Sequence, residues 1–370
     1  MEFFEKYKSN TCASGANQHY FTMEKGEVRT SRVFYKIFAG GEYNYSLLFS
    51  NIIDSTYADG DVSYKNLLCD SWTIHSAKVG ICSHIHEDIT SYGNISVRDF
   101  KDITFGGKIF KEVMPGEFFS TDSIKLKFEK GEFLCLEMTY SGTMLPYHEE
   151  SLLPIYEKKG EKWIYCKKMP LPGMIGCDRP CKEQIGFWGD SITQGIGSTL
   201  NSYLHWNARL SDMIGEDYAY WNLGIGYGRA NDAASGGAWM YKALKCDTII
   251  VCFGVNDLCR QFTVEETQRD LNIIIDTLKS NGKRVILQTI PPFDYNEERN
   301  AKWVELNKYI KAELKDKVDY LYDCVPALWE SPQKPNMAKY GGHPDDEGGR
   351  VWAEAMYGDI KDIFGSDCIG

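Results

Sequence analysis

Hydrophobic and polar residues alternate along the first half of the chain, in runs at 32–38, 45–52, 123–140 and 162–168. Successive side chains of a strand point to opposite faces, so this period of two predicts half-buried strands. Turn clusters such as "EKGE" and "MPGE" separate the runs, and no long amphipathic helix interrupts them. The pattern therefore predicts an all-β sandwich, jelly-roll-like, over residues 1–175.

A Pro- and Gly-rich segment at 168–184, predicted to be a linker or a crossing strap, leads into a different rhythm. Short apolar strand patterns now alternate with helical ones, which predicts a parallel sheet with helices on both faces. The expectation is a three-layer α/β/α domain over residues 183–370. The predicted strands are Ile185–Trp188, Ala219–Leu223, Thr248–Phe253, Val285–Ile290 and Tyr320–Tyr322, and the predicted helices are Tyr203–Ile214, Val264–Lys279, Ala301–Leu314 and Gly349–Phe364.

The loops that follow these strands hold the candidate chemistry, because sites in open parallel sheets form at the carboxyl ends of the strands. The first strand ends in "GDSIT" with Ser191, and the second in "NLGIGYGR" with Gly224. The third ends in "GVND" with Asn256, and a late loop, "GGHPDDEG", places His343 before the final helix. Together these loops supply the parts of an acyl-transfer site.

A serine needs a base to become a nucleophile. Only two histidines lie beyond residue 183, and His205 falls inside a predicted helix, so His343 is assigned as the base by elimination. The Ser191 N–H, the Gly224 N–H and the Asn256 amide are candidate donors for an oxyanion. Two supporting residues complete the prediction: Asp190 is expected to organise the turn, and Arg229 to brace the oxyanion loop.

"GDSIT", "NLG", "GVND" and the late His-Pro resemble four sequence blocks of the SGNH/GDSL hydrolase superfamily. The resemblance implies that Ser191 is the nucleophile, that Gly224 and Asn256 complete the oxyanion hole, and that His343 is the base. It implies no metal and no organic cofactor. The first half, with "LLFSNIIDS" and "ITFGG", is similar to the β-sandwich that precedes the catalytic domain in some bacterial members.

The sequence departs from the family pattern at Tyr340, where the family usually has an aspartate three residues before the histidine. One hypothesis is a Ser-His dyad in which a backbone carbonyl orients the imidazole. The alternative is a carboxylate from elsewhere, and the candidates for it are Asp345, Asp346, Glu149 and Glu150. An orienting group matters because it fixes the tautomer and stabilises the imidazolium.

Several motifs have plainer interpretations. "GDSIT" alone could be a helix cap. "SHIHED" at 83–88 could hold a metal between its two histidines, but a solvated strand face is favoured. Cys177 and Cys181 are interpreted as structural, and "PYHEE" at 146–150 as an ordinary loop that could border the active site. The glycines of "GIGYG" do not have dinucleotide-binding spacing.

The composition narrows the function classes. A net charge of -11 over 370 residues disfavours nucleic acid and anionic membranes as partners. The twelve cysteines lie mostly in apolar stretches, and no signal peptide and no run of about 18 apolar residues occurs, so a cytoplasmic location is expected.

The predicted function is a serine esterase that removes small acyl groups, with acetyl as the favoured group, from a carbohydrate. Its substrate would then be a small-molecule or oligosaccharide ester. One alternative is a lysophospholipase or thioesterase that acts on lipid acyl esters. A second is a carbohydrate-binding protein whose catalytic domain has decayed. The sequence leaves the sugar, the acyl length and the oligomeric state open.

Overall fold

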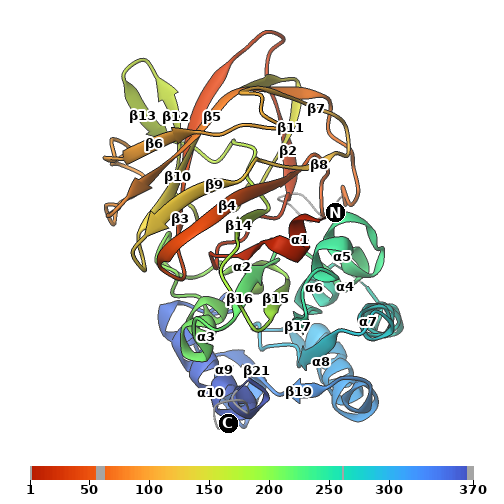
Figure 1. Cartoon of the computed structure of the whole chain (residues 1–370). Coiled ribbons are helices and arrows are strands. Elements are labelled where there is room, and N and C mark those ends of the chain that lie inside the picture. The colour runs from red at the N-terminus through yellow and green to blue at the C-terminus, as the bar shows by residue number, and fades with distance from the viewer. Residues whose placement is uncertain (1, 56–62, 261, 365–370) are drawn as a thin grey trace.

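A β-rich half packs on an α/β half in the computed structural model, which describes residues 2–55, 63–260 and 262–364 (Figure 1). The first half consists of one short helix and two facing antiparallel sheets, with a small two-stranded ribbon, β2–β11, beside them. One sheet has the order β1-β14-β4-β8 with β9 also on β4, and the other has the order β13-β12-β3-β10-β5-β6 with β7 also on β5. Their elements are α1 (Phe3–Lys6), β1 (Lys8–Ser9), β2 (His19–Thr22), β3 (Arg29–Lys36), β4 (Gly41–Ser50), β5 (Trp72–Cys82), β6 (Arg98–Asp102), β7 (Lys111–Val113), β8 (Phe118–Ser120), β9 (Ile124–Phe128), β10 (Phe133–Gly142), β11 (Met144–Tyr147), β12 (Ile155–Lys159), β13 (Lys162–Tyr165) and β14 (Met174–Cys177).

The alternation in the sequence decides which side chains enter the sandwich core. Along β10, Leu134, Leu136, Met138 and Tyr140 are all buried between the two sheets. Cys135, between two of them, belongs to a smaller apolar cluster on the opposite face. This arrangement is what the period of two predicts for a strand in the middle of a sheet.

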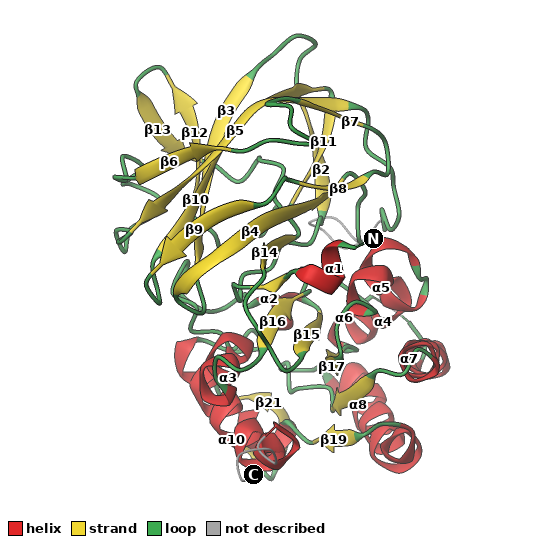
Figure 2. Ribbon diagram, in the orientation of Figure 1, coloured by secondary structure: helices red, strands yellow, loops and turns green. Residues whose placement is uncertain are grey.

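The second half is a five-stranded parallel sheet with helices on both faces (Figure 2). Helices α3 and α10 pack together on one face, and α7 packs with α4 and α8 on the other. The elements are β15 (Gln184–Gly189), α2 (Ser191–Gln194), α3 (Trp206–Ile214), β16 (Ala219–Asn222), α4 (Ala230–Ala234), α5 (Gly237–Ala243), β17 (Thr248–Cys252), α6 (Val255–Cys259), α7 (Val264–Ser280), β18 (Arg284–Gln288), α8 (Glu297–Tyr309) with a following π turn (Ile310–Leu314) and 3-10 turn (Lys315–Lys317), β19 (Tyr320–Tyr322), α9 (Val325–Leu328), β20 (Trp329–Ser331), β21 (Lys334–Ala338) and α10 (Asp346–Phe364).

The strand order of this sheet is β16-β15-β17-β18-β19. The chain therefore goes first to one side of β15 and then to the other, so the connections that leave β15 and β17 diverge. In doubly wound sheets the crevice at such a switch point is where ligands bind. The topology thus singles out the carboxyl ends of β15 and β17.

The predicted fold class, an all-β sandwich followed by a three-layer α/β/α domain, is confirmed. Two local predictions are wrong. The segment predicted as a linker contains β14, which pairs with both β1 and β4 inside the first sheet. Helix α3 begins at Trp206, so His205 is its N-cap residue and not part of its interior. The domain limits at 175 and 183 stay a prediction.

The two halves share buried contacts. The ring of Phe4, in α1, packs against Trp221 and Tyr241 of the second half. Lys242 Nζ lies 2.8 and 2.6 Å from the two carboxylate oxygens of Asp54, and both side chains are almost completely buried. This ion pair joins the sandwich to α5, so a change at either residue disturbs the junction.

We expect Lys242→Met to lower the free energy of unfolding by about 3–5 kcal/mol, because it leaves the Asp54 carboxylate buried without its partner. The double variant Asp54→Leu/Lys242→Met should recover most of the loss, since it removes both charges together. Chemical denaturation of the three proteins measures this, with the exposed Lys25→Met as the matched control. A single variant as stable as the wild type would contradict the role of the pair.

Candidate active site

Ser191 is the first residue of α2 and lies two residues after the end of β15, a strand flanked by β16 and β17. Asp190 precedes it as the N-cap, and its side chain accepts a hydrogen bond of 2.9 Å from the Ile192 N–H. Gly195 ends the helix with φ 114°, a conformation that favours glycine. The capping interpretation is thus correct for Asp190. It does not exclude chemistry at Ser191, whose hydroxyl is not used by the cap.

His343 contacts Ser191 although 152 positions separate them, and the Ser191 Oγ to His343 Nε2 distance is 2.8 Å. The loop that carries His343 packs against Gly197, where a Cβ would lie 2.6 Å from the His343 carbonyl oxygen. The Phe293 ring meets the imidazole edge to face, with centroids 5.3 Å apart. These contacts hold the imidazole beside the serine hydroxyl.

Burial lowers the pKa of His343 below its ordinary value of 6.5. The carboxylates close to it in sequence serve other partners: Asp345 accepts from the Gly348 N–H at 2.8 Å, and Asp346 from the Thr199 N–H at 2.9 Å. Within the described ranges, His343 Nδ1 has no hydrogen-bond partner. Neither Asp345 nor Asp346 is therefore placed to orient the imidazole as the sequence suggested.

Asn256 lies near the start of α6, just beyond the end of β17. Its Nδ2 donates a hydrogen bond of 3.0 Å to the Gly228 carbonyl oxygen, in the loop after β16. An amide nitrogen carries two hydrogens, so the second can serve a substrate oxygen. Strands β15 and β17 are neighbours, with Gly189 opposite Cys252, which places Ser191 and Asn256 on adjacent strand ends.

The structure argues against the predicted role of Gly224, because its N–H is committed to the Asn222 side chain at 2.9 Å. A Cβ at Gly224 would lie 2.1 Å from the Gln194 nitrogen, so this glycine permits close packing behind α2. The nearby Ser14 hydroxyl donates to the Gly224 carbonyl oxygen at 2.6 Å. Gly224 is therefore not a free oxyanion donor, as the sequence predicted, and instead packs behind α2, the helix that begins with Ser191.

Arg229 pairs with Asp232 at 2.8 Å, and both side chains are buried at the start of α4. The same helix end is tied to Asp257, whose carboxylate accepts from the Ala230 N–H at 3.0 Å. Burial raises the pKa of Asp257 to about 7, and the pKa of Asp190 likewise to about 7. Sequence reasoning missed Asp257, although it follows Asn256 directly and an acid there is suited to fix the neighbouring loop.

The loop at 146–150, favoured as an ordinary loop, in fact borders this region from the sandwich. The Glu150 carboxylate lies against Gly226. The backbone carbonyl oxygen of Glu150 accepts a hydrogen bond of 2.6 Å from Gln194 Nε2. Glu150 also accepts from Gln18 Nε2 at 2.9 Å, so it is not placed to orient His343. The first half of the chain therefore helps to form the surroundings of the nucleophile.

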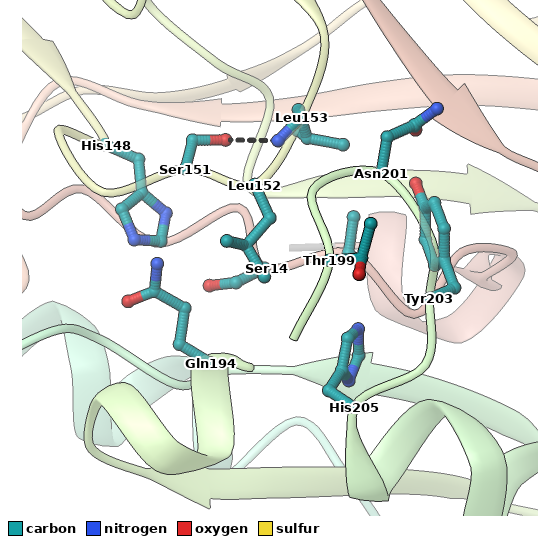
Figure 3. Close-up of a pocket in the computed structure, with 11 residues that line it drawn as sticks. Ser14, His148, Ser151, Leu152, Leu153, Gln194, Thr199, Asn201, Tyr203 and His205 are labelled. Carbon is teal, nitrogen blue, oxygen red and sulfur yellow. Dashed lines mark hydrogen bonds between the residues drawn. The ribbon is translucent and has the colours of Figure 1, made fainter. Parts of the chain in front are cut away.

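A small cavity lies behind α2, between the two halves, and His148, Gln194 and Ser14 are among the residues that line it (Figure 3). His148 is fully buried, and burial lowers its pKa to about 4. Among the residues that the structure describes, neither of its ring nitrogens makes a hydrogen bond of standard geometry, and the same holds for Gln194 Oε1 and Glu149 Oε2. Buried polar groups of this kind are commonly satisfied by ordered water.

The "SHIHED" segment is not a strand, because β5 ends at Cys82. In the loop, His86 Nδ1 accepts from the Asp88 N–H at 3.0 Å, and the His86 ring packs on Tyr92. Among residues 2–55, 63–260 and 262–364, no cluster of three or more His, Cys, Asp or Glu side chains is placed to hold a metal ion. The cysteines of the same ranges, Cys177 and Cys181 included, are unpaired.

Residues 187–351 match the family model of the GDSL-like lipase/acylhydrolases. This part of the chain is a GDSL-type hydrolase domain. The match confirms the resemblance on which Ser191 and His343 were singled out, and with it the class of enzyme, an SGNH-type ester hydrolase. A comparison with curated protein sequences finds no significant match.

The chain is also similar to solved structures. A member of the lipolytic G-D-S-L family from Veillonella parvula is 18% identical, with 50% of this chain and 98% of that chain covered and a TM-score of 0.39. An acetyl-xylooligosaccharide esterase variant from Geobacillus is 19% identical, with 52% of this chain and 98% of that chain covered and a TM-score of 0.37. A family two carbohydrate esterase from Clostridium thermocellum, in complex with cellohexaose, is 12% identical, with 97% of this chain and 99% of that chain covered and a TM-score of 0.41. Likenesses at these TM-scores decide nothing about the substrate.

In the described part of the chain, none of the helices combines the length and the apolar character needed to cross a membrane.

The lowered pKa of His343 predicts the acid limb of the pH profile. A general base works in its neutral form, so kcat/KM for p-nitrophenyl acetate should fall on acidification only below pH 6.5. Initial rates at constant ionic strength over pH 4–8 measure the limb, and Asp345→Asn should leave its position unchanged because the asparagine can still cap α10. An acid limb centred above pH 6.5 would contradict this assignment.

Proposed function

We propose that the hydrolase domain cleaves carboxylic esters through Ser191 and His343. The observation that carries the proposal is the 2.8 Å contact between Ser191 Oγ and His343 Nε2. A nucleophile and base within hydrogen-bond reach are the first requirement for covalent acyl transfer. The position of Ser191 at the start of α2, just beyond β15, supports the same role, since nearby backbone N–H groups favour developing negative charge.

The proposed reaction has two stages, acylation and hydrolysis of the acyl-enzyme. His343 Nε2 takes the proton of Ser191 Oγ as this oxygen bonds to the ester carbonyl carbon. The Ser191 N–H and the Asn256 side chain stabilise the oxyanion of the tetrahedral intermediate. His343 then returns the proton to the leaving alcohol, and an acyl-enzyme remains. A water molecule, deprotonated by His343, releases the carboxylic acid and restores Ser191.

No carboxylate in the described part of the chain contacts His343, so it would perform these transfers without one. The His343 imidazole is then oriented by the packing of its loop on Gly197 and by its contact with the Phe293 ring. The absence of a carboxylate is consistent with the lowered pKa, because only burial acts on the imidazole. We therefore propose a Ser-His pair in place of a triad with Asp345 or Asp346.

For the substrate we propose a small acyl ester, such as an acetyl ester, of a carbohydrate. Three polar side chains lie next to the loop that follows β16: Gln18 and Glu150 from the sandwich, and Asn256 from the hydrolase domain. Polar groups of this kind suit an alcohol that carries hydroxyl groups, whereas a long acyl chain requires apolar walls.

We expect hydrolysis of p-nitrophenyl acetate to exceed that of the butyrate and octanoate esters. Ser191→Ala should lower kcat on the acetate by a factor on the order of 10⁴ or more, because the nucleophile is lost. The matched control is Ser202→Ala, whose hydroxyl donates to the Thr199 carbonyl oxygen and accepts from the Leu204 N–H, both in its own loop.

Each contrary result has a distinct meaning. A preference for octanoate would contradict the small acyl group and favour a lysophospholipase or thioesterase. Equal activity of Ser191→Ala and the wild type would contradict the nucleophile. An inert wild type would favour a carbohydrate-binding protein with a decayed catalytic domain.

A further inference from the structure

Glu150 belongs to the β-sandwich, but its side chain packs against the loop that follows β16 in the hydrolase domain. A Cβ at Gly226 would lie 1.5 Å from Glu150 Oε2 and 2.7 Å from its Cδ. The carboxylate therefore occupies the space that a side chain at position 226 would fill. Two residues further along this loop, the Gly228 carbonyl oxygen accepts the hydrogen bond from Asn256.

Three hydrogen bonds hold Glu150 in one conformation. Gln18 Nε2 donates to Oε2 at 2.9 Å, and the Glu150 N–H donates to Gln18 Oε1 at 3.1 Å. The Glu150 carbonyl oxygen accepts from Gln194 Nε2 at 2.6 Å, in the helix that begins with Ser191. Glu150 is thus tied both to the nucleophile helix and to the loop beside it. A residue fixed in this way is preorganised to contact a ligand.

One oxygen of this carboxylate remains available. Oε2 is engaged by Gln18, while Oε1 has no hydrogen-bond partner among the residues that the structure describes, and Glu150 is partly exposed. An ionised carboxylate can only accept hydrogen bonds, so it cannot stabilise an oxyanion. Its natural partner is a hydroxyl donor, and in an ester substrate such a donor lies on the alcohol part.

We propose that Glu150 is a specificity-determining residue that accepts a hydrogen bond from a free hydroxyl group on the alcohol part of the ester. The inference rests on the proposed function and deepens it: the enzyme takes acyl esters of polyhydroxy alcohols, such as sugars, in preference to esters of plain alcohols. The sandwich then contributes directly to substrate choice. A site built to bind a hydroxyl group rejects an analogue that lacks it, because its own polar group is left unpaired.

Two acetate esters, each of a CH2–OH group on a saturated six-membered ring, test this proposal. One is methyl 6-O-acetyl-glucopyranoside, which carries hydroxyl groups on its ring, and the other is cyclohexylmethyl acetate, which carries none. The measured quantity is the ratio of their kcat/KM values. The wild type should prefer the sugar ester, and Glu150→Gln should reduce the ratio by about 10- to 100-fold, because an uncharged acceptor binds a hydroxyl more weakly. The matched control is Glu161→Gln, at an exposed position of the sandwich, which should leave the ratio unchanged.

The outcomes separate this inference from the proposed function. Ser191-dependent hydrolysis of both esters with an equal ratio in the wild type and Glu150→Gln overturns the role of Glu150 alone. An equal fall on both esters in Glu150→Gln also overturns it, since Glu150 would then act only on the fold. A wild type that discriminates against the sugar ester overturns it without the use of any variant. A wild type inert towards both esters overturns the proposed function and this inference together.

Discussion

The hydrogen bond between Ser191 and His343 is the contact on which the rest of the hydrolase domain depends. It joins the end of β15 to the loop before the last helix, so both must be held in place to within about 0.5 Å. Trp206 of α3 stacks on Trp352 of α10, with ring centroids 4.9 Å apart, and fixes the two helices on the same face of the sheet. Gly197 admits the loop of His343 at a distance that any side chain would prevent.

Burial is the second constraint, because it decides the protonation of the groups around the nucleophile. The pKa of His343 is lowered and those of Asp190 and Asp257 are raised, in each case chiefly by the loss of water. These shifts favour neutral forms, and a neutral imidazole is the form that can accept a proton. The same buried surroundings strengthen the hydrogen bonds that Asp190 and Asp257 accept from the backbone, which keeps the turns at the two strand ends in place.

The sequence predicts most of the fold, since period-two alternation and βαβ rhythm are local signals that burial then enforces. It also predicts that Ser191 and His343 meet, because strand ends of a parallel sheet share one edge. It does not predict β14, whose pairing with β1 and β4 joins distant segments that carry no period of their own. The sequence also misses the roles of Gly224 and Glu150, for a related reason. The direction of the Gly224 N–H and the approach of the Glu150 loop from the sandwich both depend on packing, which no motif records.

Covalent capture of the nucleophile tests the central claim most directly. Ethyl p-nitrophenyl methylphosphonate loses p-nitrophenol when a serine oxygen bonds to its phosphorus, and intact mass spectrometry counts the groups transferred. We predict one phosphonyl group per wild-type chain, mapped by peptide analysis to Ser191, and a strongly slowed reaction in His343→Ala. Labelling at another residue, or equal rates in the two proteins, would contradict the assignment of Ser191 and His343.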